Sequence, residues 1–173
     1  MKYLLFVPPK NFRDESLKTV RLLFDRWKIG YSISSYTKSG VGTGAHGATA
    51  KIDINTNKAN PEEYDGIILL DGSGIEEYKI YDFRPLLDLV NLFIRLNKRV
   101  VSIGNSAKIL AKANVIKGLS ISAPKDPSVR NMIEMFHGSP SDKGMEISGN
   151  IITMNGSELE YSIQKFLEHI GVK

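Results

Sequence analysis

Two patterns of apolar positions alternate along the chain, and they predict strands separated by helices. Continuous apolar runs are typical of strands that are buried on both faces of a parallel sheet. Such runs occupy residues Tyr3–Val7, Gly66–Leu70, Val100–Ile103 and Ile151–Met154. Tyr31–Tyr36 predicts a further strand, and Ser120–Ala123 predicts a short one.

Between these runs, apolar residues recur at helical spacing and predict amphipathic helices. The three clearest apolar faces are Leu17, Val20, Leu23, Phe24 and Trp27; Leu86, Leu87, Val90, Phe93 and Ile94; and Leu159, Ile163, Phe166, Leu167 and Ile170. Ser106–Ala113 and Val129–Phe136 predict two shorter helices. Gly30 is expected to end the first helix, Asn60 to cap a helix start, and Ser157–Glu160 to form a capping box.

This order of elements predicts an α/β, three-layer sandwich with a mainly parallel sheet. The length of 173 residues fits one domain over residues 1–173. The segment 38–50 is rich in glycine, serine and threonine and is expected to be a loop or a hairpin.

The carboxyl ends of parallel strands are where ligands bind in such sheets. Three predicted loops follow strand ends and should converge there: Pro8–Ser16, Asp71–Ile75 and Gly104–Ser106. The glycines of Asp71–Gly74 could offer backbone amides to an anion, but we favour a plain turn and place an oxyanion-binding turn second. We therefore expect a ligand site at this edge of the sheet.

The stretch Arg99–Gly118 predicts a strand, a sharp turn and a helix, which is the architecture of a nucleophile elbow. The residue at the turn is Gly104, which has no side chain, and the chain contains no cysteine. Glycine adopts strained elbow conformations without the steric cost that other residues meet. We therefore predict a positive φ at Gly104 and an elbow without its nucleophile.

Composition excludes several classes of function. The net charge of +4 is spread over a mixed surface, so we expect no nucleic acid as partner. No apolar run is long enough to span a bilayer, and the first one ends at Pro8-Pro9, so we expect a cytoplasmic protein with no membrane contact. No His-x-x-x-His or Asp-x-Asp spacing is present, and His46, His137 and His169 lie in a loop and at two predicted helix ends, so we expect no metal. We also expect no cofactor.

Four segments, in order along the chain, resemble those of the PfpI superfamily, also called the DJ-one superfamily. They are Asn11–Leu17, Asn60–Gly74, Val100–Gly118 and Gly149–Gly156. The resemblance implies a flavodoxin-like fold of the class I glutamine amidotransferase-like kind. It also implies a homodimer or a larger homo-oligomer. Family members include cysteine peptidases, glyoxalase-type hydratases, proposed deglycases, chaperones and stress-response proteins.

The catalytic residues of that family are absent at the matching positions. The elbow cysteine aligns with Gly104, its histidine neighbour with Asn105, and the glutamate with Ser16; a shift of one residue would place Glu15 in the acid position. The family's elbow glycine aligns with Ser106, which we interpret as the N-cap of the following helix. Only the scaffold positions match the family pattern.

Three functions remain open. The first is a catalytically silent homologue, or pseudoenzyme, that binds a small ligand through Gly72, Ser73, Gly74, Asn105 and Ser106, or that serves as an oligomeric or regulatory subunit. The second is a hydrolase or glyoxalase-type enzyme with relocated chemistry on Glu15, Asp14, Ser106 or Ser73. The third is a subunit that supports an active paralogue. We favour the first, because the nucleophile, its neighbour and the acid all differ from the family pattern.

Overall fold

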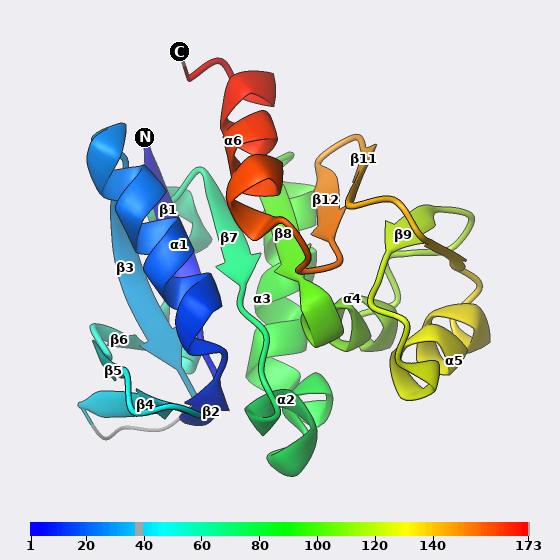
Figure 1. Ribbon diagram of the computed structural model, residues 1–173, viewed down its shortest axis with the longest axis horizontal. Helices are drawn as coiled ribbons and strands as arrows, with labels where there is room; N and C mark the ends of the chain where they lie inside the picture. Colours follow the sequence, from blue (N-terminus) through cyan, green and yellow to red (C-terminus); the bar gives the residue numbers. More distant parts are fainter. Residues whose placement is uncertain (37–39, 173) are drawn as a thin grey trace.

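The computed structural model describes residues 1–36 and 40–172, and its centre is a seven-stranded sheet (Figure 1). Five strands form its parallel body: β1 (Lys2–Phe6), β3 (Gly30–Ser35), β7 (Gly66–Leu69), β8 (Arg99–Ile103) and β12 (Ile151–Met154). Their spatial order is β3-β1-β7-β8-β12, with β6 (Ile54–Asn55) and the antiparallel β11 (Met145–Ser148) at the edges. This is the flavodoxin-like order, and it confirms the expected fold class.

The strands are buried on both faces because their apolar residues alternate between two cores. In β1, Leu4 and Phe6 join one hydrophobic cluster, while Tyr3 and Leu5 join the other. The first cluster is covered by α3 (Arg84–Arg95), α4 (Ala107–Lys112) and α5 (Pro127–Met135), and the second by α1 (Asp14–Arg26) and α6 (Leu159–His169).

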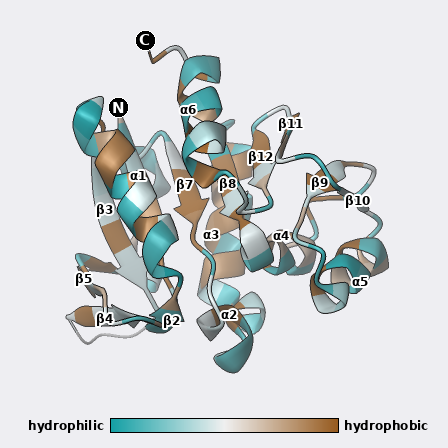
Figure 2. Ribbon diagram, in the orientation of Figure 1, coloured by the Kyte–Doolittle hydropathy of each residue, from teal (hydrophilic) through white to brown (hydrophobic). Residues whose placement is uncertain are grey.

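The hydropathy of the elements matches these three layers. Figure 2 shows β7 and β8 as hydrophobic, whereas α1 and α6 alternate between hydrophobic and hydrophilic residues. In the part of the chain that the structure describes, the helices are too short or too polar to cross a membrane.

Short strands form two small sheets that are separate from the main one. The strands β2 (Lys10–Phe12), β4 (Val41–Gly44) and β5 (Thr49–Lys51) form one small sheet, and β9 (Ser120–Ser122) pairs with β10 (Ser139–Ser141) in another. The predicted loop or hairpin is therefore a hairpin over β4 and β5, while residues 38–39 of that prediction lie outside the described residues. The remaining helical turns are α2 (Gly74–Glu77), η1 (Thr56–Lys58), η2 (Pro61–Glu63), η3 (Ile80–Asp82) and η4 (Gly104–Ser106).

Two predicted helix boundaries were wrong, and one cap was confirmed. Helix α1 ends at Arg26 and turns through Lys28 at φ +56°, so Gly30 instead begins β3. Helix α6 starts after Glu158 without a capping side chain, because the Ser157 hydroxyl donates to Asn155 Oδ1 rather than closing a capping box. The Asn60 side chain does accept from the Glu62 N–H, at the start of a single 3₁₀ turn.

Candidate functional site

The elbow has the backbone conformation that the sequence predicted. Between β8 and α4, the chain reverses through η4, and Gly104 has a φ of +56°. This left-handed conformation costs a side-chain-bearing residue free energy but is accessible to glycine. The prediction of a positive φ at Gly104 is confirmed.

The Ser106 side chain forms hydrogen bonds with the backbone of the elbow and is not accessible to a ligand. Its side chain is fully buried, and Oγ accepts from the Ile103 N–H at 3.0 Å. The same hydroxyl can donate to the carbonyl of Leu69 at 2.7 Å or to that of Ile103 at 2.8 Å. Ser106 occupies the N-cap position of α4, as interpreted from the sequence, but its side chain makes no capping hydrogen bond to that helix and instead ties the elbow to the end of β7.

The carboxyl group of Asp71 stands above Gly104. Asp71 follows β7 and is 7% exposed. A Cβ atom placed on Gly104 would lie 2.5 Å from Asp71 Oδ2 and 3.0 Å from Asp71 Cβ. The Asp71 side chain thus fills the space into which an elbow side chain would project.

Burial raises the pKa of Asp71, and the Ser16 hydroxyl and the Arg13 guanidinium partly offset this effect. Arg13 Nη1 lies 3.8 Å from Asp71 Oδ2. Among the described residues, Asp71 Oδ1 is buried and has no hydrogen-bond partner. A buried polar atom without a partner is uncommon in folded proteins and calls for an explanation.

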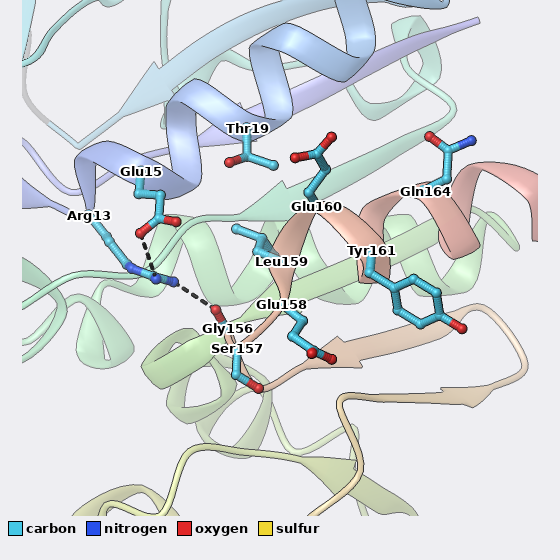
Figure 3. A pocket seen from close by; sticks show the side chains of 10 residues that line it. All are labelled: Arg13, Glu15, Thr19, Gly156, Ser157, Glu158, Leu159, Glu160, Tyr161 and Gln164. Atoms are coloured by element: carbon cyan, nitrogen blue, oxygen red, sulfur yellow. Dashed lines mark hydrogen bonds and ion pairs between the residues drawn. The ribbon is translucent and has the colours of Figure 1, made fainter.

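Arg13 joins three segments around Asp71. Its backbone N–H donates to the Asp71 carbonyl at 2.8 Å, and its Nη1 donates to the Gly156 carbonyl at 2.9 Å. Its Nη2 pairs with Glu15 Oε2 at 3.1 Å, as Figure 3 shows. The loop before α1 is thereby linked to the ends of β7 and β12.

Asn105 closes the glycine-rich turn after β7. Its Oδ1 accepts from the Gly72 N–H at 3.2 Å, and its Nδ2 donates to the Gly72 carbonyl at 2.8 Å. The Gly72 amide is therefore already occupied. Gly74 is buried, and a Cβ there would meet the Lys10 carbonyl and Pro8 Cβ, so Gly74 faces the chain around β2.

Two cavities adjoin this cluster. One of about 420 Å³ lies over the elbow and is lined by Arg13, Asp71, Gly72, Gly104, Asn105, Pro124, Asp126, Asn155, Gly156 and Ser157. Another of about 770 Å³ lies between α1 and the start of α6, where Glu15, Glu158 and Glu160 surround it (Figure 3). We place the candidate site in the smaller cavity, because the ends of β7, β8 and β12 converge there.

The structure brings together some of the residues singled out from the sequence. Gly72, Gly104 and Asn105 line the elbow cavity, while Glu15 lines the neighbouring one. Ser16 and Ser106 are buried, and Ser73 and Gly74 do not line the elbow cavity.

Sequence reasoning missed Asp71, Arg13 and Gly156. The sequence pattern indicated Asp71 only as the first residue of a glycine-rich turn. An acidic residue directly after a buried strand, at the edge where the loops meet, was the signal that could have identified it.

The histidines lie away from the elbow cavity. The His46 N–H donates to Asp14 Oδ1, His137 follows the end of α5 with φ +68°, and His169 is the last residue of α6. In residues 1–36 and 40–172, no group of three or more histidine, cysteine or acidic side chains is arranged to hold a metal ion.

Comparison with known proteins decides the family. The model of the DJ-1/PfpI family matches residues 1–169. The chain belongs to the DJ-1/PfpI family. Its resemblance to this family, stated above from four segments, is thereby confirmed.

Several relatives carry names that point to enzymes. The chain is 30% identical over 157 residues to a deglycase of Pyrococcus horikoshii, covering 86% of this chain and 87% of the relative. It is also 30% identical over 152 residues to an uncharacterized protein of Methanocaldococcus jannaschii, covering 88% of this chain and 73% of that one. DJ-1/PfpI relatives are therefore named as enzymes, while this chain's own activity is open.

Solved structures of the family share the fold. A ThiJ/PfpI domain protein from Brachyspira murdochii superposes with a TM-score of 0.87 at 21% identity, covering 97% of this chain and 96% of that one. Drosophila melanogaster DJ-1beta superposes with a TM-score of 0.83 at 18% identity, covering 99% and 91%. At these identities the likeness concerns the fold alone.

Proposed function

We propose that this chain is a DJ-1/PfpI protein without the family's cysteine chemistry, whose elbow cavity binds a small ligand. One observation carries the proposal: Gly104 keeps the left-handed elbow, while the space for its side chain is filled by Asp71. Glycine cannot act as a nucleophile, and no cysteine elsewhere in the chain can replace it.

The elbow cavity supports binding because its geometry is maintained without the nucleophile. The side chains of Asn105 and Ser106 donate hydrogen bonds to backbone carbonyls at the end of β7 and in the turn after it. The Arg13 side chain donates to the Gly156 carbonyl and so links two neighbouring loops. These contacts preorganise the walls of a cavity, which lowers the cost of ligand binding. As a cytoplasmic homodimer or larger homo-oligomer, such a protein could report ligand binding to a partner, an active paralogue included.

The second candidate is a hydrolase or glyoxalase-type enzyme with relocated chemistry. The observation that favours it is the buried Asp71 carboxyl group with its raised pKa, since perturbed carboxyl groups in clefts often serve as acids or bases. Among the residues proposed to carry relocated chemistry, Ser106 is buried. The Asp14 carboxylate accepts hydrogen bonds from the backbone N–H groups of His46 and Ala48. Glu15 is exposed beside the neighbouring cavity.

Turnover of methylglyoxal and of a generic peptidase substrate tests the proposal. The natural protein is compared with a variant carrying Ser16→Glu, Asp71→Gly, Gly104→Cys and Asn105→His. The Asp71→Gly change is included because a side chain at Gly104 would collide with Asp71. The matched control carries the same changes with Gly104→Ala in place of Gly104→Cys.

We expect turnover from the cysteine variant only. Turnover by the natural protein would reject the proposal and favour relocated chemistry, which combined substitution of Asp14, Glu15, Asp71 and Ser73 should then abolish. Recovery of the natural protein with a DJ-1/PfpI paralogue from its native cell would support the subunit role. Recovery of homomers alone would count against that role.

A further inference from the structure

Two glycine turns lie against the Asp71 carboxyl group. A Cβ on Gly104 would touch Asp71 Oδ2, and a Cβ on Gly156 would lie 3.6 Å from the same oxygen and 3.8 Å from Gly104 Cα. Both glycines have positive φ, +56° and +93°. Two tight turns, one after β8 and one after β12, therefore leave room for one side chain, and that side chain comes from the loop after β7.

This carboxyl group has unused hydrogen-bonding capacity. Asp71 lines the elbow cavity, and within the described chain its Oδ1 has no partner. A carboxylate accepts hydrogen bonds at both oxygens, and leaving one buried oxygen without a donor is costly. A donor from outside the protein would remove that cost.

The charges around Asp71 restrict what that donor can be. Arg13 lies within ion-pair distance of Asp71 and already supplies its positive partner, so an added cation would have to compete with the guanidinium. An added anion would meet the carboxylate of Asp71 and, on the cavity rim, that of Asp126. A neutral hydroxyl meets neither the competition with Arg13 nor the repulsion by the carboxylates, and it still donates a hydrogen bond.

We propose that the Asp71 carboxyl group, standing in the space of the absent Gly104 side chain, is the ligand-contacting group of the elbow cavity and accepts a hydroxyl donor from a small uncharged molecule. This inference rests on the proposed binding function and names its ligand class. It assigns the ligand contact to a residue of the loop after β7 rather than to the elbow itself.

Three simple probes test this assignment at constant ionic strength: glycerol, methylammonium chloride and sodium acetate. Binding is followed by NMR, through the amide signals of Gly72, Gly104 and Gly156 and the carboxyl ¹³C signal of Asp71. We expect saturable shifts with glycerol, weakened at least tenfold by Asp71→Ala. Asp71→Asn keeps the shape of the side chain and therefore controls for loss of binding through altered packing. This variant should retain part of the affinity for glycerol.

The matched control is Asp88→Ala on α3, which removes an exposed carboxylate that pairs with Arg84 away from this cavity. It should leave the glycerol response unchanged. Glycerol shifts that do not saturate, or that persist in Asp71→Ala, would overturn the proposal, as would saturation by methylammonium or acetate at lower concentration than glycerol. Because binding is measured without turnover, an active natural protein would refute the silent function while leaving this test independent.

Discussion

Asp71 Oδ2 and Gly104 compete for the same small space, since a Cβ on Gly104 would stand 2.5 Å from that oxygen. The two residues are distant in sequence, because Asp71 follows β7 and Gly104 follows β8, and they meet only in the folded protein. Substitutions at either position should therefore depend on the other, and this coupling is measurable.

Gly104→Ala should destabilise the fold more than an alanine at a comparable turn. The matched control is Gly149→Ala, because Gly149 has φ +61° and open space around its missing Cβ. We expect the control to lose about 1 kcal/mol of unfolding free energy from backbone strain. Gly104→Ala should lose a further ~1–3 kcal/mol from overpacking against Asp71.

The double variant Asp71→Gly, Gly104→Ala isolates the contact. It should recover most of the excess loss, with a coupling of about 0.5–3 kcal/mol in a double-mutant cycle from urea unfolding. Equal losses for Gly104→Ala and Gly149→Ala would show that Asp71 moves aside without cost.

Asp71 should also make stability depend on pH. Because burial raises its pKa above the ordinary 3.8, the folded protein binds the Asp71 proton more readily than the unfolded chain does. The Asp71 contribution to unfolding free energy therefore falls as pH rises from about 3.8 through the folded pKa, and it is constant above that. Asp71→Asn should remove this slope and be more stable than the natural protein at neutral pH.

Urea unfolding of both proteins at a series of pH values measures that difference. The natural protein should lose stability relative to Asp71→Asn as the pH increases across the window. A relative gain instead would mean that Arg13 lowers the pKa of Asp71 by more than burial raises it.

Ser106→Ala should destabilise the elbow. The substitution leaves the buried Ile103 N–H without its 3.0 Å acceptor, which costs about 1–3 kcal/mol for an unsatisfied buried donor. Ser128→Ala, at an exposed position in α5, should change the unfolding free energy by less than about 0.5 kcal/mol. Thermal unfolding of the two variants gives the comparison, and a loss as small as the control's would show that water replaces the hydroxyl.

The ion pair between Lys108 and Glu76 should respond unequally to loss of its two members. Lys108 Nζ lies 2.8 Å from Glu76 Oε2, yet the lysine side chain is 5% exposed and the glutamate 52%. Glu76→Gln leaves a largely buried ammonium group without its carboxylate and should cost about 1.5–3 kcal/mol, the contribution of a hydrogen bond to a charged group. Lys108→Met leaves a carboxylate that water can solvate, so its cost should be smaller.

Chemical unfolding of both variants orders these costs. A larger loss for Lys108→Met would indicate that the contact of the Lys108 ammonium with the Tyr81 ring, 5.3 Å from Nζ to the ring centroid, adds to the ion pair.

Local patterns were reliable where structure depends on neighbours in sequence. The apolar run Tyr3–Val7 became β1, whose alternate residues enter two cores, and the glycine at the predicted turn has the expected positive φ. Helix ends were less predictable. Lys28 adopts φ +56°, and Ser157 bonds to Asn155, because caps depend on competing side-chain contacts within a few residues.

The sequence by itself determined the three-layer fold, the elbow and the absence of its cysteine, since strand and helix periodicities and residue identity are local properties. Only the tertiary structure decided which side chain fills the elbow. Asp71, Gly104, Gly156 and Arg13 come from segments far apart in the chain, and they meet because parallel strands bring their carboxyl ends to one edge of the sheet. No periodicity specifies how closely those ends approach, because that distance is set by the packing of whole layers.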